Sequence, residues 1–222
     1  MRYLRKIDLA ILKWAYQRSY KPSFIIKALV FIGDGPFWLI VMAVAAFIGQ
    51  IFNALSFEQV ANLLIFGLTI TNFVITPLKK GVKRKRPYAD KQLLDELNLI
   101  ISNRDPGHGS KELESFPSGH AVWTSLSVFI ISFQFGYIGL LLFGWMIPAI
   151  LYLRPHLGVH YPSDVIAGFF IGGVNAMITI YFSPTILGLV TNLKGNNFYT
   201  YGYWTFILFF LFYGYKSWLK RV

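Results

Sequence analysis

The chain has 222 residues, of which 55% are hydrophobic and 18% aromatic, while only 14% are charged. With a mean hydropathy of +0.51, it is too apolar for an ordinary soluble domain of its length. It contains no cysteine, which excludes a disulfide framework and a thiolate metal site. No soluble basic domain is available to carry the net charge of +11, so we expect anionic lipid headgroups and phosphate as partners, and no nucleic acid.

Residues 1–21 mix basic side chains with Leu, Ile, Trp and Tyr. This pattern predicts an amphipathic helix that lies on the bilayer surface. The uninterrupted apolar stretch is short and lacks a small-residue cleavage site, so we do not expect a cleaved signal peptide.

Apolar segments long enough to cross a membrane follow along the chain. The polar loop at 88–116 separates two of them, and a short amphipathic helix is expected within it at 92–101. The sequence therefore predicts an all-α, polytopic membrane helical bundle, with residues 1–222 forming a single membrane-embedded domain. The six expected spans lie at about 24–52, 58–78, 119–135, 137–153, 165–182 and 203–218.

The first span is interrupted by Gly33-Asp34-Gly35-Pro36, which predicts a kink because Pro removes a donor and clashes with the preceding turn. A carboxylate inside a membrane is costly and is often functional. A capped helix break that faces the headgroups is the better explanation of Asp34, so we leave this residue out of the site.

Basic or histidine-bearing clusters stand at the ends of these spans. Two spans separate the amino terminus from the first cluster at 79–87, and two more separate the second cluster at 117–120 from the third at 154–164. An even number of crossings returns the chain to the same side, so all three clusters are expected on one membrane face. The basic residues near both termini are expected on that face too.

The first cluster contains Lys79 and Arg86, which are seven positions apart and would share one face of a continuing helix. A guanidinium fork and a mobile ammonium together suit a tetrahedral phosphate dianion. A basic collar held by anionic headgroups explains an isolated cluster of this kind as well. We assign that explanation to the remaining members, Lys80, Lys83, Arg84 and Lys85.

The second cluster, Pro117-Ser118-Gly119-His120, stands at the start of the third span. Ser118 is a favoured helix N-cap, and Gly119 allows the backbone to approach a ligand closely. The free N–H groups of a helix start bind anions, and His120 in the first turn could donate a proton to a leaving oxygen. A solvated histidine at the interface is the simpler explanation for His120 taken alone.

The third cluster contains His160 and Asp164, four residues apart between the fourth and fifth spans. If the fifth helix begins near His160, the carboxylate can hydrogen-bond one ring nitrogen and leave the other free to attack phosphorus. Asp164 as a helix-start acid that complements the dipole is the alternative for an isolated pair.

The three clusters together resemble the three-part signature of the type-2 phosphatidic acid phosphatase superfamily, which also includes class A bacterial acid phosphatases and vanadium haloperoxidases. The resemblance rests on Lys79, six residues and Arg86-Pro87, then Pro117-Ser118-Gly119-His120, then Arg154, five residues, His160, three residues and Asp164. The family often has Ser before the third-cluster Arg. Here Leu153 takes that place, which is expected to remove one hydrogen bond.

The resemblance implies a helical, metal-independent lipid phosphatase without a cofactor. His160 would attack phosphorus and form a phosphohistidine, His120 would protonate the leaving group, and Asp164 would orient His160. The remaining matched residues would hold the phosphate oxygens. These are Lys79, Arg86, Ser118, the backbone at Gly119, and Arg154. His108 and His156 match no motif position and are interpreted as bystanders.

Two other classes compete with this interpretation. A vanadate-dependent haloperoxidase would use similar residues, but its known members are larger and soluble. A non-enzymatic or transport-type membrane protein with the same fold would be expected to lose the third cluster, which is intact here. The substrate stays open among phosphatidic acid, phosphatidylglycerol phosphate and undecaprenyl diphosphate, and so does the oligomeric state.

The membrane face of the site is also open. Of the 21 basic residues, all but Lys194 fall on the catalytic side or just inside it, which the positive-inside rule assigns to the cytoplasm. Related bacterial lipid phosphatases commonly act on the outer face.

Overall fold

The computed structural model describes residues 2–107 and 113–219. These residues form a helical bundle, and within them the only β-type pairing outside helices is an isolated bridge between Lys85 and Glu114. The helices are α1 (Arg2–Tyr16), α2 (Phe24–Ile32), α3 (Gly35–Ile51), α4 (Leu55–Val82), a 3₁₀ turn (Pro87–Ala89), α5 (Lys91–Leu97), α6 (Gly119–Phe135), α7 (Tyr137–Phe143), α8 (Met146–His156), α9 (Pro162–Tyr181), α10 (Ser183–Leu193) and α11 (Asn197–Leu219).

The predicted all-α membrane fold is confirmed, and each of the six expected spans coincides with one or two helices. By length and composition, three helical stretches of the described chain can cross a membrane: Leu55–Val82, Tyr137–His156 and Pro162–Tyr181. The bent pair α2–α3 makes a fourth, with an angle of 68° at the predicted Gly-Asp-Gly-Pro break. The six crossings therefore remain a prediction, because α6 has only 17 residues and α11 does not meet the same test.

The outer surface of the bundle is suited to lipid. Large apolar side chains point away from the helices along most of their length, among them Phe73, Ile138, Leu141 and Phe170. A soluble protein rarely exposes apolar surface this extensively. Together with the apolar helices, these side chains make the chain a multi-pass membrane protein.

Helix α4 differs from the prediction at its carboxyl end. We expected it to stop near Pro77, but it continues to Val82 and ends where Lys83 adopts a left-handed conformation with φ of 50°. Pro77 is thus inside the helix, and Lys79 is in its last turns. Helix α10 was not predicted, and α5 is shorter than the expected 92–101 because Asn98 ends it in a left-handed conformation.

Helices α6 and α9 pack closely at the centre of the bundle. A Cβ atom added at Gly168 would lie 2.7 Å from the carbonyl oxygen of Ser118, and one added at Gly172 would lie 2.3 Å from that of Val122. This spacing of two small residues, four apart, is typical of close helix pairs in membranes. It brings the start of α9 against the start of α6.

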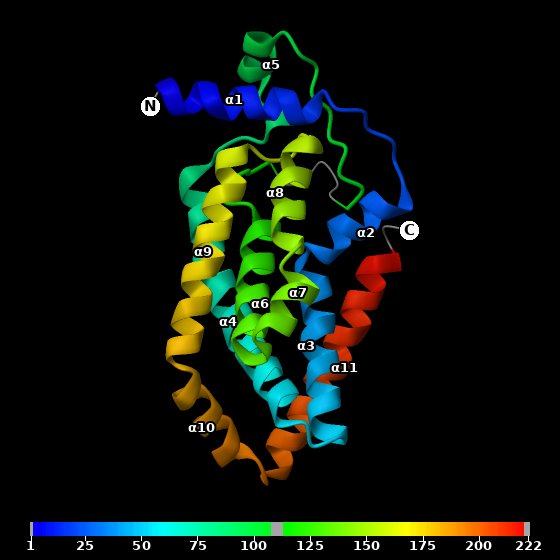
Figure 1. The fold of residues 1–222 in the computed structure, drawn as a ribbon, viewed down its shortest axis with the longest axis vertical. Helices are drawn as coiled ribbons and strands as arrows, with labels where there is room; N and C mark the ends of the chain where they lie inside the picture. The colour runs from blue at the N-terminus through cyan, green and yellow to red at the C-terminus, as the bar shows by residue number, and fades with distance from the viewer. Residues whose placement is uncertain (1, 108–112, 220–222) are drawn as a thin grey trace.

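Different helix ends lie at the two ends of the bundle (Figure 1). Helix α1 lies across one end, and the carboxyl ends of α4, α8 and α11 meet the amino ends of α6 and α9 beneath it. The opposite end holds α10 and the start of α4. The three sequence clusters therefore meet at one end, as the count of spans predicts.

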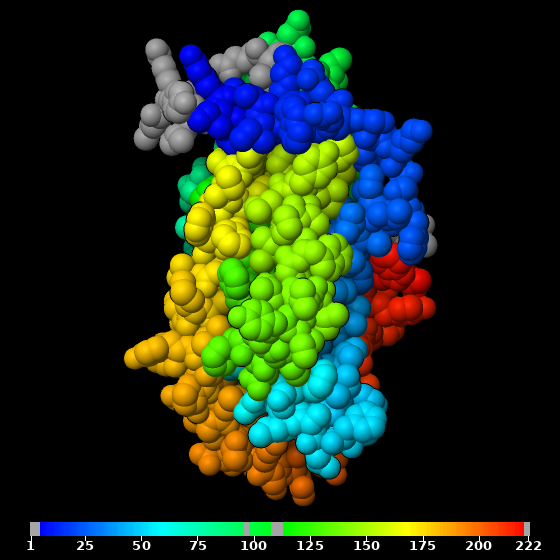
Figure 2. Space-filling model, in the orientation of Figure 1, coloured from blue at the N-terminus to red at the C-terminus, as the bar shows by residue number. Residues whose placement is uncertain are grey.

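Helix α1 confirms the predicted amphipathic segment. Its inner face carries Asp8, Leu12, Ala15 and Tyr16, all buried. Figure 2 shows that its surface covers the upper ends of α8 and α9.

Candidate active site

The three clusters surround a cavity of about 260 Å³ at the end covered by α1. Its lining comes from the α2–α3 break, the end of α4, the start of α6, the loop before α9 and the carboxyl half of α11. The lining residues are Asp34, Pro36, Lys79, Arg86, Gly119, His120, Trp123, His160, Tyr213 and Ser217. It combines two cations with two imidazole rings in a space that fits a phosphoryl group.

Two chain segments pair with each other beside this cavity. The N–H of Arg86 donates to Leu113 at 2.9 Å, and the N–H of Ser115 donates to Arg84 at 2.7 Å. The Arg86 side chain also donates through Nε to the carbonyl oxygen of Glu114 at 3.3 Å. This pairing connects the end of the first cluster to the segment that precedes the second.

His160 is buried in the short loop between α8 and α9. Its Nδ1 lies 2.7 Å from the carbonyl oxygen of Ser115. A carbonyl oxygen can only accept, so Nδ1 carries the proton and the neutral ring keeps its lone pair on Nε2. Burial, together with the positive charges of Arg154, Arg86 and Lys79, holds the pKa of His160 well below its usual range. The ring is therefore neutral near pH 7, as a nucleophile must be.

Asp164 does not make the expected hydrogen bond to His160. Helix α9 begins at Pro162, after His160, so the two residues do not share a helical face, and Asp164 Oδ2 lies 4.0 Å from His160 Nδ1. Instead, Asp164 accepts from the hydroxyl of Ser115 and from the N–H of Tyr161 at 3.1 Å. Its influence on His160 passes through Ser115, whose carbonyl oxygen holds the ring.

Arg154 is fully buried at the end of α8 and is paired with Asp105 at 2.7 Å. Its Nη1 also lies 3.4 Å from Nε2 of His120. Since a guanidinium only donates, Nε2 of His120 is the acceptor in this contact, and the ring has to gain a proton before it can act as an acid. The polar loop thus contributes a carboxylate that compensates the buried charge and aims the guanidinium at His120.

Several buried donors next to the cavity have no acceptor within the described residues. They are Nε and Nη2 of Arg154 and the hydroxyl of Ser118. Ser118 is the N-cap residue of α6, but its side chain makes no capping hydrogen bond. Thr124 and Ser127 also have buried hydroxyls that find no partner in the described part of the chain. An unsatisfied charged donor is more costly than a hydroxyl, so the two free nitrogens of Arg154 are the stronger indication of an absent anion.

The predicted residues are brought together, although not always for the expected reason. Lys79, Arg86, Gly119, His120 and His160 line the cavity, while Ser118, Arg154 and Asp164 lie directly behind that lining. The proposed helical register of Lys79 and Arg86 is wrong, because α4 ends between them.

Of the residues we excluded, Asp34 caps α3 through a bond from Gly35 N at 2.9 Å and also lines the cavity. His156 lies away from it and donates to Ala15 at 2.8 Å. His108 falls outside the described residues.

Three further residues support the site and were not predicted from the sequence. Arg84, interpreted as part of a basic collar, forms an ion pair with Asp164 at 2.6 Å. Asp105 and Ser115 lie in the polar loop and received no role. None of the three has a motif-like spacing, so only the fold relates them to the histidines.

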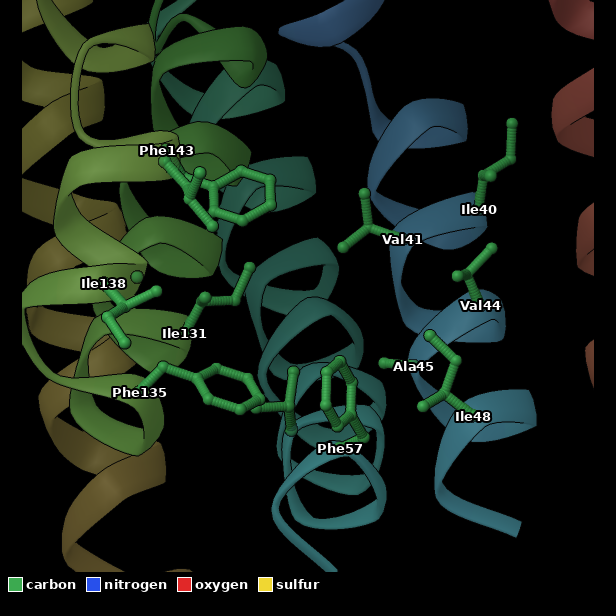
Figure 3. A pocket seen from close by; sticks show the side chains of 13 residues that line it. Ile40, Val41, Val44, Ala45, Ile48, Phe57, Ile131, Phe135, Ile138 and Phe143 are labelled. Carbon is green, nitrogen blue, oxygen red and sulfur yellow. The ribbon is translucent and has the colours of Figure 1, made fainter. Parts of the chain in front are cut away.

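A second hollow, of about 380 Å³, lies between α3, α4, α6 and α7 (Figure 3). Its lining is entirely apolar, with Val41, Ile48, Phe57 and Phe135 among its members. It holds no group that could carry out chemistry. Among the described residues, no group of three or more His, Asp or Glu side chains is placed to hold a metal ion.

The chain resembles two solved structures in fold. Crystal structures of Aquifex aeolicus LpxE and of a transmembrane PAP2 type phosphatidylglycerolphosphate phosphatase from Bacillus subtilis superpose with TM-scores of 0.62 and 0.63, each at 19% sequence identity. The first match covers 79% of this chain and 95% of LpxE, and the second covers 84% and 89%. No curated protein matches the chain in sequence.

The family comparison covers the site directly. A family model described as the PAP2 superfamily matches residues 60–187, more than half of the 222 residues. The match contains all three clusters, from Lys79 to Asp164. The chain belongs to the PAP2 superfamily.

Proposed function

We propose that the protein is a membrane lipid phosphatase that acts through a phosphohistidine on His160. The observation that carries this proposal is a neutral histidine that lines the cavity with an unprotonated Nε2, close to a buried Arg154 whose Nε and Nη2 have no acceptor among the described residues. A phosphoryl group placed there would accept from the donors and present its phosphorus to the ring.

In the first step, the Nε2 lone pair of His160 forms a bond to phosphorus while the bond from phosphorus to the leaving oxygen breaks. The leaving oxygen takes the electron pair of that bond and a proton from His120. In the second step, the oxygen of a water molecule forms a bond to phosphorus while the bond from phosphorus to Nε2 of His160 breaks and its electron pair returns to the ring. His120 accepts a proton from that water, and phosphate is released.

The remaining cluster residues stabilise charge during both steps. Lys79 and Arg86 line the cavity, and the first N–H groups of α6 point out of the helix start at Gly119. With Ser118 and Arg154 they form a set of donors for the three non-bridging oxygens. Asp105 holds Arg154, and Asp164 holds Ser115, so both carboxylates act behind the donors.

The substrate class follows from the position of the cavity. It opens where apolar helices end, which suits a phosphate carried on a lipid. One structural neighbour is described as a phosphatidylglycerolphosphate phosphatase. We propose a lipid monophosphate or diphosphate of that kind as substrate, the cell membrane as location, and residues 1–222 as one phosphatase domain with its site at the membrane–water interface.

Phosphate release from purified lipid phosphates tests the proposal. Phosphatidic acid, phosphatidylglycerol phosphate and undecaprenyl diphosphate would be supplied in detergent micelles, with and without a chelator. We expect release from at least one lipid, unchanged by the chelator, and its loss in His160→Ala. Release that continues in His160→Ala, or that requires an added divalent ion, would overturn this mechanism.

The membrane face of the site needs a separate experiment. The positive charges assign the site to the cytoplasmic face, whereas related bacterial lipid phosphatases commonly act on the outer face. A reporter at the carboxyl terminus, read from both sides of the membrane, identifies the face that carries the site. The bundle places the end of α11 at the catalytic end, so the reporter and the cavity share a face.

A further inference from the structure

Asp8 is a carboxylate on the inner face of the interfacial helix α1, and only 6% of it is exposed. It accepts from the N–H of Ser163 at 2.8 Å, from the Ser163 hydroxyl at 2.7 Å and from Arg84 Nη2 at 2.7 Å. A buried carboxylate needs such partners. All of them come from segments next to the active site, although α1 contributes nothing to the cavity lining.

Arg84 connects Asp8 to the catalytic cluster. Its Nη2 donates to Asp8 while its Nη1 donates to Asp164 Oδ1 at 2.6 Å, and its guanidinium stacks on the ring of Tyr161 at 3.7 Å. The planar fork holds two carboxylates in fixed directions, which the single ammonium of a lysine cannot do. The position of Asp164 therefore depends on both ends of the Arg84 fork.

The second oxygen of Asp164 continues the network to the nucleophile. It accepts from the Ser115 hydroxyl, and the Ser115 carbonyl oxygen accepts from Nδ1 of His160 at 2.7 Å. Each link joins residues that are distant in sequence. The orientation of the His160 ring is thus fixed by Ser115, which is held by Asp164, which is held in turn by Arg84.

On the basis of this network and of the proposed function, we infer that Asp8 is a positioning residue for the nucleophile His160, acting through Arg84, Asp164 and Ser115. Helix α1 then contributes to catalysis, because its position on the bundle determines the direction in which Nε2 of His160 points. The alternative is that Asp8 only anchors α1. If Asp8 positions the nucleophile, its removal lowers the rate of attack on phosphorus. If Asp8 only anchors α1, its removal lowers the amount of folded protein alone.

The test measures formation of the phosphohistidine in the first turnover, with radiolabelled phosphatidic acid in micelles at a saturating excess over the enzyme. The amplitude reports the folded fraction, and the rate constant reports the geometry of attack. Asp8→Asn keeps the shape of the side chain but loses the charge that holds Arg84. We expect its rate constant to fall about 10- to 100-fold, with amplitude and KM unchanged, because a small misorientation of a reacting group has effects of this size.

Tyr16→Phe is the matched control. The Tyr16 hydroxyl also anchors α1, through Ser102 N at 3.0 Å and the Ser102 hydroxyl at 3.2 Å, but it does not touch the Arg84 network. We expect this variant to keep the wild-type rate constant. A fall as large as that of Asp8→Asn would show that anchoring of α1 alone is responsible, and would overturn the inference.

Arg84→Lys tests the next link and replaces Asp8→Asn if that variant does not fold. It keeps the positive charge and loses the fork, so we expect a comparable fall in the rate constant. The double variant should be no slower than the slower single one, because both substitutions break the same path. A wild-type enzyme that forms no phosphohistidine with any of the three lipid phosphates refutes the proposed function. A wild-type rate constant in Asp8→Asn, or in Arg84→Lys where that variant stands in for it, refutes this inference alone.

Discussion

The polar side-chain pairs at the two ends of the bundle differ in how deeply they are buried. At the distal end, Lys194 pairs with Glu58 at 2.6 Å and Gln134 donates to Gln59 at 2.7 Å, beside the apolar hollow of Figure 3. At the catalytic end, the pair of Arg154 and Asp105 is completely buried, and Arg154 still has two donors that find no acceptor among the described residues.

This contrast separates stability from function within one fold. Polar pairs at the distal end join helices, so their loss should affect folding and leave chemistry unchanged. At the catalytic end, the unsatisfied donors destabilise the folded protein, and a bound anion would offset this loss of free energy. Substitutions there should affect catalysis more than folding.

The largest effect should come from Arg154→Lys. The lysine can still pair with Asp105 but cannot supply Nε and Nη2 to a phosphoryl group. We expect kcat/KM to fall by about 10²- to 10³-fold, the usual consequence of losing a transition-state donor. Arg104→Lys, outside the cavity, serves as the control. If both variants kept wild-type kcat/KM, the free donors of Arg154 would have no catalytic role.

Ser115→Ala should give a smaller loss. It removes the hydroxyl that donates to Asp164 and keeps the carbonyl oxygen that accepts from His160. We expect the first-turnover rate constant to fall about tenfold, less than a full displacement of the ring would cause. Ser127→Ala, which removes a buried hydroxyl that bonds to none of the described residues, should leave the rate constant unchanged. Equal rates in the two variants would contradict the role of Ser115.

The pH dependence of kcat/KM examines the charge at the catalytic end. Protonated His160 cannot attack, and its pKa lies well below the usual 6.5, so His160 remains reactive at pH values below 6.5. Lys79→Met removes a neighbouring cation, which raises the pKa of His160 and moves the acid limb to higher pH. Lys80→Met, an exposed neighbour, is the control on the same substrate. An acid limb at the same pH in Lys79→Met would contradict this assignment.

The smallest effect is expected at the distal end. Lys194→Met breaks the pair with Glu58, but the Lys194 side chain is 43% exposed, so the loss of stability should be under about 1 kcal/mol. Thermal unfolding in detergent measures this loss, and phosphate release should remain at the wild-type rate. A large fall in activity would show that the two ends are not separate.

The sequence predicted the helices other than α10, the break at 33–36 and the meeting of the three clusters at one end. Apolar length and helix breakers determine the first two, and the count of spans determines the third. Motif residues such as Gly119 and His120 could be recognised because each motif combines particular residue types at a fixed spacing in the sequence.

The supporting residues could not be predicted in this way. Arg84 is one of several cations in a row, and only the left-handed turn at Lys83 directs it to Asp164. Asp105 lies in a loop without periodicity, and its pairing with Arg154 depends on the path of that loop. Such contacts arise from tertiary packing, and the spacing of residues in a single sequence does not predict them.

The site of covalent phosphorylation tests the central claim most directly. The enzyme would be mixed with radiolabelled phosphatidic acid, quenched in alkaline detergent, where a phosphohistidine survives, and mapped by mass spectrometry of its peptides. We predict label on His160 alone, and no label in His160→Ala. Label on any other residue, or phosphate release in the wild-type enzyme without a labelled intermediate, would contradict the account.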